Sequence, residues 1–221
     1  MICKAKSAHR AEPQISEPAI LLPGWKRALD LTFCLVALPV LAIATLGVVV
    51  LTSLASPGPV FFRQERIGWR GRKFQLYKFR TMHVSSNVTA HQTHFSELMR
   101  ANTPMQKLDA RGDKRVIPGG SLLRASGLDE LPQLINVLRG EMSLVGPRPS
   151  LPYECEQYAP HHRRRLECVP GLTGLWQVSG KNRTTFEEMV QLDVEYVSRR
   201  SVALDLKIMA RTLPVVLGQV V

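Results

Sequence analysis

Two neighbouring acids, Asp129 and Glu130, stand near the start of the stretch SGLDELPQLINVLRGEMSLVGPRP at 126–149. Adjacent carboxylates can provide a nucleophile, a general base or ligands for a hard divalent cation. On local grounds a structural interpretation is favoured. Ser126 and Asp129 have the spacing of a capping box, and acids in a first helical turn gain about 0.3–1 kcal/mol from the helix dipole. The rest of the chain has to decide between the two.

An amphipathic helix is expected to begin at these acids. Four apolar side chains follow the i, i+3, i+4, i+7 spacing of a buried helical face: Leu131, Leu134, Ile135 and Leu138. Pro132 is tolerated in a first turn, and Gly140 is suited to end the helix. The helix would therefore hold both carboxylates at its N-terminal end.

Arginine and lysine side chains near this helix suit phosphate. Arg148 lies between two prolines after a strand-like piece, so its guanidinium would lose little entropy on binding an anion, although an incidental turn arginine is an open alternative. Short strands or extended loops are expected between 56 and 82, and this segment includes Lys78 and Arg80. These two cations fit a phosphate site, a basic face near anionic lipid, or both.

Composition narrows the class of partner. The chain has 221 residues, enough for one catalytic domain, and a formal net charge of +11, which predicts an anionic partner: nucleic acid, an acidic membrane surface or a phosphorylated substrate. Four cysteines without a C-x-x-C pair indicate neither a zinc site nor a disulfide framework, and favour a reducing compartment. Aromatic content of 6% and the lack of a nucleic-acid-binding motif argue against nucleic acid.

An uncharged apolar run from 31 to 55 is long enough to cross a bilayer. A cleavable signal peptide is disfavoured because the run is long and starts late, and a buried soluble helix because it is apolar on every face. Cations flank both ends, and Pro39 interrupts the run, so we favour a proline-broken, re-entrant helix over a straight span. The expected parts are a disordered tail at 1–23, this membrane helix at 24–57 and a cytosolic, membrane-associated catalytic domain at 58–221.

The remaining segments predict a mixed α/β fold that is mainly helical. A polar loop at 83–111 should contain a short helix at 95–100, and its His91 and His94 have no partner pattern for a metal site. Two amphipathic helices are expected at 186–200 and 202–216. Interfacial membrane helices and plain core helices fit their patterns equally well.

Four runs in fixed order resemble the bacterial sugar transferase family, the monotopic phosphoglycosyl transferases: FFRQERIGWRGRKFQLYKFRTM, LDELPQLINVLRGEMSLVGPRP, VPGLTGLWQVSGK and LDLKIMARTLPVVL. The resemblance extends from Trp25 to Val221 and implies the minimal catalytic unit of the family. It implies transfer of a hexose 1-phosphate from a UDP-sugar to undecaprenyl phosphate at the cytoplasmic face of the bacterial inner membrane, with release of UMP and initiation of exopolysaccharide or related glycan synthesis.

The resemblance also implies roles for individual residues. Asp129 would form a covalent aspartyl-phosphosugar, Glu130 would support the metal or handle a proton, and both would bind Mg²⁺. The remaining implied contacts are Arg124, Arg148, Lys78 and Arg80 with phosphate, and Gln177 and Lys181 with the nucleotide. A homodimer stays open as the assembly.

Two departures from the family pattern concern the membrane break and the turn before the acids. Leu38 precedes Pro39 where many relatives have serine, and 126–128 reads Ser-Gly-Leu instead of Thr-Ser-Leu. Two other functions stay as alternatives, a catalytically silent membrane adaptor of a polysaccharide assembly complex and a membrane-anchored nucleic-acid binder. The sequence does not identify the transferred sugar, although the resemblance slightly favours galactose or glucose.

Overall fold

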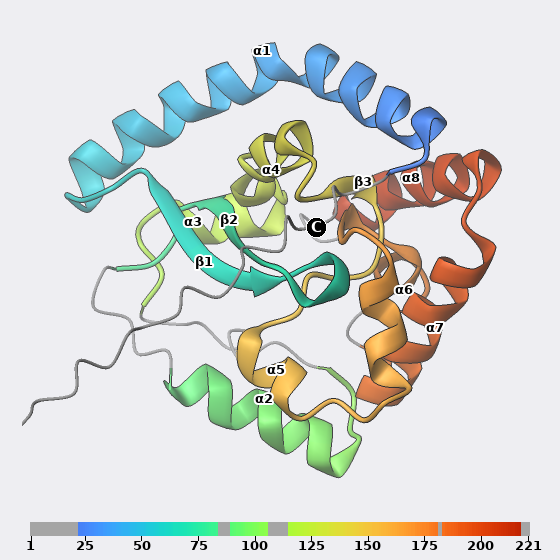
Figure 1. The fold of residues 1–221 in the computed structure, drawn as a ribbon. Coiled ribbons are helices and arrows are strands. Elements are labelled where there is room, and N and C mark those ends of the chain that lie inside the picture. The colour runs from blue at the N-terminus through green and yellow to red at the C-terminus, as the bar shows by residue number, and fades with distance from the viewer. Residues whose placement is uncertain (1–21, 84–88, 106–114, 181–182, 218–221) are drawn as a thin grey trace, which may run out of the picture.

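The computed structural model describes residues 22–83, 89–105, 115–180 and 183–217. Its helices and strands form a mixed, mainly helical α/β fold, as expected (Figure 1). The elements are α1 (Gly24–Ala55), β1 (Phe61–Ile67), β2 (Lys73–Phe79), α2 (Thr89–Ala101), α3 (Gly120–Ala125), α4 (Gln133–Arg139), β3 (Ser143–Val145), α5 (Pro152–Glu156), β4 (Gly171–Thr173), α6 (Leu175–Val178), α7 (Phe186–Arg199) and α8 (Val202–Leu217), with the 3₁₀ turns η1 (Trp69–Gly71), η2 (Leu128–Glu130) and η3 (His162–Glu167).

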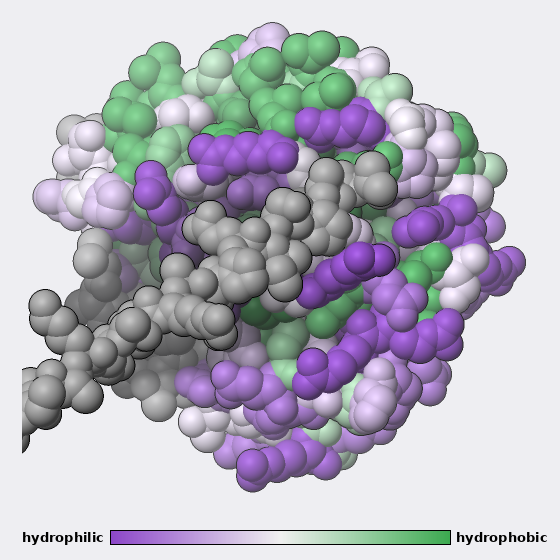
Figure 2. Space-filling view, in the orientation of Figure 1, coloured by the Kyte–Doolittle hydropathy of each residue, from purple (hydrophilic) through white to green (hydrophobic). Residues whose placement is uncertain are grey.

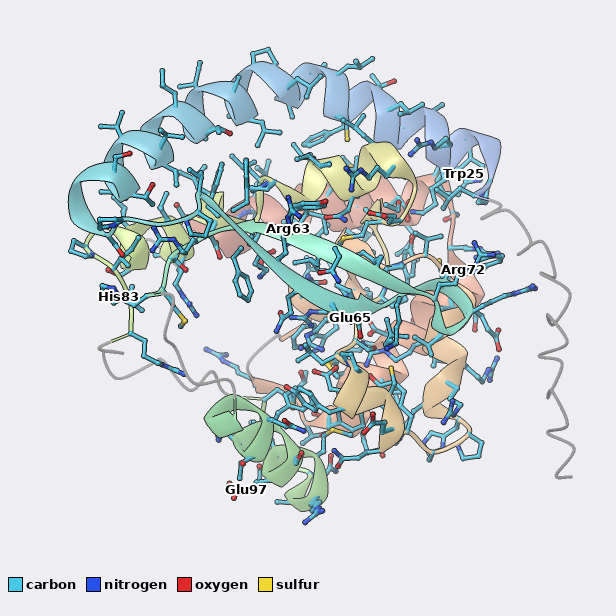
Figure 3. The ribbon with its side chains drawn as sticks, turned by 60° about the vertical axis from the view of Figure 1, so that its left-hand side comes forward. Trp25, Arg63, Glu65, Arg72, His83 and Glu97 are labelled. Atoms are coloured by element: carbon cyan, nitrogen blue, oxygen red, sulfur yellow. The ribbon has the colours of Figure 1, made fainter. Side chains whose placement is uncertain are left out.

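Helix α1 is the one helix of the described chain that is long and apolar enough to cross a membrane. It contains Pro39 and is bowed over the rest of the molecule (Figures 1 and 3). Its inner face buries Cys34, Leu41 and Val48 at intervals of seven residues. Its outer face leaves apolar side chains exposed, and they gather along the upper part of Figure 2: Phe33, Leu35, Val36, Leu38, Val40, Ile43, Leu46, Val49 and Val50.

The first turns of α1 are anchored by charged side chains. Arg27 donates two hydrogen bonds of 2.6 Å to the carbonyls of Val137 and Leu138, which lie in the last turn of α4. Lys26 is buried and forms an ion pair with Asp205 of α8, while its Nζ also donates to the Tyr196 hydroxyl at 2.9 Å. These bonds fix the start of α1 against two other helices.

The other end of α1 is held from strand β2. Arg80 follows β2 directly and is only 4% exposed. Its guanidinium donates to the carbonyl of Ser56, to the Ser56 hydroxyl at 3.0 Å and to the carbonyl of Pro59 at 2.6 Å. His83 lies at the same end, with Nδ1 3.4 Å from the Ser56 hydroxyl, and Figure 3 shows it far from Trp25 in the first turn. Both ends of α1 are therefore bonded to one globular body.

Strands β1 and β2 form an antiparallel hairpin in which Phe62 pairs with Lys78. The hairpin runs beneath α1 (Figure 3). The free edge of β2 is bonded to Asn136 of α4, whose amide oxygen accepts from the Tyr77 N–H at 3.1 Å and whose amide nitrogen donates to the Gln75 carbonyl at 2.7 Å. This buried asparagine sets the position of β2 relative to the segment that contains the two acids.

A short parallel pair, β3 and β4, joins the GPRP and PGLTG motifs. Ser143 pairs with Gly171 and Val145 with Thr173. A Cβ added at Gly171 would lie 2.0 Å from the amide nitrogen of Gly146, so only glycine allows the two backbones to approach this closely. The segments around the two motifs are thereby fixed against each other.

Several expected elements are confirmed. The strands between 56 and 82, the strand before Gly146 and the helices α7 and α8 are present, and Gly140 ends α4 in the left-handed conformation with φ of 77°. The short helix expected at 95–100 is longer, Thr89–Ala101. Of the tail expected at 1–23, residues 1–21 lie outside the described residues, as does the side chain of His91.

The expected capping box is wrong. The hydroxyl of Ser126 donates back to the carbonyls of Leu122 and Leu123, at 2.8 and 3.1 Å, so Ser126 belongs to the end of α3. Gly127 then turns the chain with φ of 70°, and the two acids lie in the 3₁₀ turn η2, ahead of α4. A left-handed residue interrupts an α-helix, so a helix that began at Ser126 could not continue through Gly127. Glycine adopts this conformation without steric penalty.

Candidate active site

Asp129 and Glu130 occupy a single 3₁₀ turn between α3 and α4. The amide of Glu130 donates to the Gly127 carbonyl at 3.1 Å, and the amide of Leu131 to the Leu128 carbonyl at 3.2 Å. Both acidic side chains are half-buried. The turn therefore fixes the backbone of the acids and leaves part of each side chain open to a ligand.

Strand β2 brings Lys78 to this turn. Its Nζ lies 2.7 Å from Oε1 of Glu130, and the two side chains are 24% and 40% exposed. An ion pair with this exposure is weak in water, so either partner can exchange it for another charge. Lys78 is thus a predicted phosphate contact that the structure bonds to the acid pair.

Exposed apolar side chains lie in the segment that leads to the acids. Leu122 of α3 is 65% exposed, and Leu128 is the residue immediately before Asp129 and is also exposed. Gly119, at the start of α3, lies against Leu51 near the end of α1, where an added Cβ would come within 3.0 Å of the leucine side chain. The start of the segment that leads to the acid pair is thus packed against the end of α1.

The other predicted phosphate contacts differ in their surroundings. Arg124 is half-buried in the last turn of α3 and precedes Asp129 by five residues. The donors of Arg80 are engaged by the end of α1, so a phosphate at Arg80 would have to compete with carbonyl groups. Phosphate binding by either residue stays a prediction.

Arg148 forms a two-pronged ion pair with Glu154 of α5. Its Nη1 and Nη2 donate to the two carboxylate oxygens at 2.9 and 3.1 Å, and its guanidinium lies 5.5 Å from the ring centre of Phe95. The backbone around Arg148 is bonded as well, because Arg66 donates to the Pro149 carbonyl and Arg165 to the Arg148 carbonyl. Arg148 is therefore fixed by its neighbours before any ligand arrives.

The sequence interpretation missed Glu154 and Arg66. Burial alone would raise the pKa of Glu154, but the charge and hydrogen bonds of Arg148 and the charge of Arg66 outweigh it and lower that pKa. Burial, assisted by the charge of Arg148, lowers the pKa of the Arg66 guanidinium to about 10. One signal could have indicated Glu154: it follows Pro152 by two residues, the position where an acid bonds the start of a helix, and the Leu151 amide does donate to it at 3.0 Å.

Gln177 lies in α6, next to the paired strands. Its amide nitrogen donates to the Leu172 carbonyl at 3.2 Å, while its buried Oε1 has no hydrogen-bond partner among the described residues. A Cβ added to Gly174 would come within 2.8 Å of this oxygen. The nucleotide contact expected at Gln177 stays a prediction, and Lys181 lies outside the described residues.

A group of potential metal ligands lies elsewhere. His161, His162 and Glu187 place ligand atoms within 4.8 Å of one another. However, Nδ1 of His162 accepts from the Ala159 amide at 3.1 Å, so its proton belongs on Nε2, which lies 2.8 Å from Glu187. A metal at Nε2 would require a proton on Nδ1, facing the amide N–H, and the group is better explained as a bond between η3 and α7.

The family model described as bacterial sugar transferase matches residues 22–219. The chain belongs to the bacterial sugar transferase family. The resemblance of its four motifs is thereby confirmed. The matched range includes α1, the acid pair, the GPRP turn and α8.

Three relatives illustrate the range of lengths in the family. The exopolysaccharide production protein ExoY of Sinorhizobium fredii is 38% identical over 191 residues, covering 86% of this chain and 84% of that protein. The UDP-glucose:undecaprenyl-phosphate glucose-1-phosphate transferase of Caulobacter vibrioides is 40% identical over 209 residues, covering 89% and 71%. The galactosyl transferase CpsE of Streptococcus agalactiae is 41% identical over 193 residues, covering 87% of this chain but only 42% of its own length.

Proposed function

We propose that this protein transfers a hexose 1-phosphate from a UDP-sugar to undecaprenyl phosphate and so initiates exopolysaccharide or related glycan synthesis. The observation that carries the proposal is the half-buried acid pair Asp129–Glu130, in which Glu130 is bonded to Lys78 and which directly follows the exposed Leu128. A water-soluble donor and a lipid acceptor have to meet at such a boundary. The substrates named for the Caulobacter relative support the same assignment.

In the proposed first step a carboxylate oxygen of Asp129 attacks the sugar-bearing phosphorus of the donor. The bond from that phosphorus to the bridging oxygen breaks, and UMP leaves with this oxygen. In the second step a phosphate oxygen of undecaprenyl phosphate attacks the same phosphorus, and the Asp129 carboxylate leaves. The products are UMP and a lipid-linked diphospho-sugar, and the enzyme is regenerated.

Mg²⁺ fits the chemistry of the acid pair, because Asp129 and Glu130 offer the hard carboxylate oxygens that this cation prefers. Bound there, it would reduce the repulsion between the carboxylates and the diphosphate. Lys78 forms an ion pair with one oxygen of Glu130, and its ammonium group could bind a substrate phosphate instead. Removal of Mg²⁺ with a chelator is expected to stop turnover.

We also propose that α1 enters and leaves one leaflet, so that the catalytic domain lies on the cytoplasmic face of the inner membrane. A straight helix of 32 residues would be about 48 Å long and would hold its ends on opposite sides of a bilayer. The bonds from Arg27 and Arg80 tie both ends of α1 to the same globular body. Pro39, near the middle of the bow, supplies the weakened point.

The test uses purified full-length protein with undecaprenyl phosphate, Mg²⁺ and a panel of UDP-sugars, and it follows UMP release. One or two donors should turn over, and Asp129→Asn should lose at least about 10³-fold in rate because the nucleophile is gone. Incubation with donor alone should add one sugar phosphate to Asp129, which intact-mass and peptide mass spectrometry would detect.

Glu167→Gln is the matched control, since it removes an exposed carboxylate in η3 and should keep full activity. Both variants should unfold at the wild-type temperature. A folded wild type that turns over no donor would favour the silent adaptor, and full turnover by Asp129→Asn would exclude the covalent route.

A further inference from the structure

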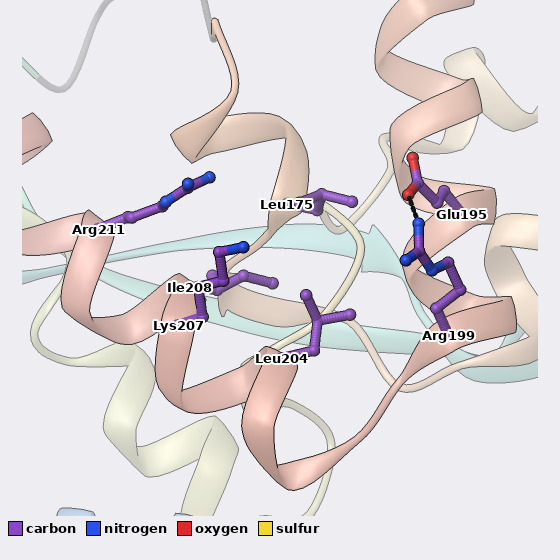
Figure 4. Close-up of a pocket in the computed structure, with 7 residues that line it drawn as sticks. All are labelled: Leu175, Glu195, Arg199, Leu204, Lys207, Ile208 and Arg211. Atoms are coloured by element: carbon purple, nitrogen blue, oxygen red, sulfur yellow. Dashed lines mark hydrogen bonds and ion pairs between the residues drawn. The ribbon is translucent and has the colours of Figure 1, made fainter.

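A pocket of about 150 Å³ lies between α6, the end of α7 and α8 (Figure 4). Its lining residues belong to these three helices, and none of them lies in η2, β2 or α3, which form the acid pair's surroundings. The pocket is therefore separate from the acid pair.

Positive charge dominates this pocket. Lys207 and Arg211 stand one turn apart on α8, and Arg199 faces them from α7. Among the described residues of the lining Glu195 is the single acid, and it is paired with Arg199 at 2.6 Å. Glu195 thus neutralises Arg199, and the lining contains two further cations, Lys207 and Arg211.

The pocket also borders an apolar surface. On α8 the side chains of Val202, Leu206 and Leu213 are exposed. Successive residues of an α-helix are about 100° apart around its axis, so Lys207 lies about a quarter of a turn from Leu206, and Arg211 lies farther round. The exposed Ala203 and Ala210 lie between the apolar stripe and the two cations, so the exposed face of α8 is apolar up to the cations. The ion pair of Lys26 with Asp205 ties this helix to the first turn of α1.

We propose that this pocket binds the phosphate headgroup of an anionic glycerophospholipid, with Lys207 and Arg211 on the phosphate and the acyl chains along the apolar stripe of α8. A soluble phosphate would use the cations but would have no use for the exposed Val202, Leu206 and Leu213. A neutral lipid would use the stripe but would leave the cations unpaired. Anionic lipid satisfies both features.

The inference rests on the membrane attachment proposed above and on no step of the transfer reaction. The two can therefore fail separately. Asp129→Asn should keep the lipid site even though it should lose turnover, and loss of the lipid site does not bear on the Asp129 intermediate.

Native mass spectrometry of the full-length protein in neutral detergent, with equal amounts of phosphatidylglycerol and phosphatidylcholine, tests the proposal. The wild type should retain one phosphatidylglycerol in preference to phosphatidylcholine. The double variant Lys207→Gln/Arg211→Gln should lower that preference about tenfold. The control Arg163→Gln/Arg164→Gln removes two exposed cations of η3 and should leave the preference unchanged.

A second variant works in the opposite direction. Glu195→Gln frees Arg199 from its ion pair, so retention of phosphatidylglycerol should rise by about twofold or more. Equal retention of the two lipids by the wild type, an unchanged preference in the double variant, or displacement of the lipid by millimolar inorganic phosphate would each overturn the proposal. Circular dichroism checks the fold of each variant, and Glu195→Gln keeps the test decisive if the double variant unfolds.

Discussion

The ion pairs Lys78–Glu130 and Arg148–Glu154 have nearly equal lengths, 2.7 and 2.9 Å, and opposite surroundings. The first lies at the surface, where water and incoming charges compete with it. In the second the Glu154 carboxylate is fully buried and receives both prongs of the guanidinium. Ion pairs of similar length therefore have different roles: the open pair can exchange partners during a reaction, while the closed pair holds the GPRP turn in place.

The closed pair should show the largest loss of stability. Glu154→Gln leaves the Arg148 and Arg66 cations without their carboxylate, and breaking a buried pair in this way costs about 3–5 kcal/mol. Urea unfolding of the full chain in detergent would measure the change. Glu156→Gln, an exposed acid at the end of the same helix, should change the free energy of unfolding by less than about 0.5 kcal/mol. Equal effects of the two variants would remove the distinction between the pairs.

The open pair should show the reverse behaviour, a loss of activity with little loss of stability. Lys78→Gln removes the cation next to Glu130 and should lower turnover by about 10²-fold, the effect typical of losing one electrostatic contact in an active site. The unfolding temperature should stay near that of the wild type.

Lys73→Gln is its control, because Lys73 begins the same strand and forms an exposed ion pair with Glu65 at 3.0 Å. It should leave turnover unchanged. If Lys73→Gln slowed turnover as much as Lys78→Gln, the charge of the hairpin as a whole would explain the effect, and the special position of Lys78 would be refuted.

The smallest expected effect is on how the free energy of unfolding depends on acidic pH, and it comes from the closed pair. Because the pKa of Glu154 is lowered in the folded chain, the unfolded chain takes up this proton first as the pH falls. The stabilisation from Glu154 is therefore complete above its ordinary pKa of 4.5 and is lost as the pH falls through the lowered value. Unfolding free energies of the wild type between pH 6 and 3 should decline more steeply than those of Glu154→Gln.

Local patterns predicted much of this fold. Of the predicted stripe, Leu131, Leu134 and Leu138 do face the interior, because helix periodicity is a property of neighbouring residues, whereas Ile135 is only half-buried. Gly140 correctly predicted the end of α4, because the left-handed conformation that ends a helix is adopted most easily by a residue without a side chain.

Partners far apart in the sequence could not be predicted in the same way. Arg80 looked like a surface cation, and only the folded chain places it at the end of α1. From the sequence, the Ser126 hydroxyl could bond either the helix before it or the helix after it. The left-handed turn at Gly127 places it at the end of α3. In the candidate site, the acids and Lys78 were identified from their motifs, whereas Glu154 required the position of α5 relative to the GPRP turn.

The buried pair of Lys26 and Asp205 joins residues 179 positions apart and has a consequence for synthesis. A ribosome adding about 5–20 residues per second delivers Asp205 roughly 10–40 s after Lys26. During that interval the ammonium group lacks the acid that later neutralises it, so it has to stay in water or among lipid headgroups. The N-terminal helix is thus ready to meet the bilayer well before the enzyme can close around its first turn.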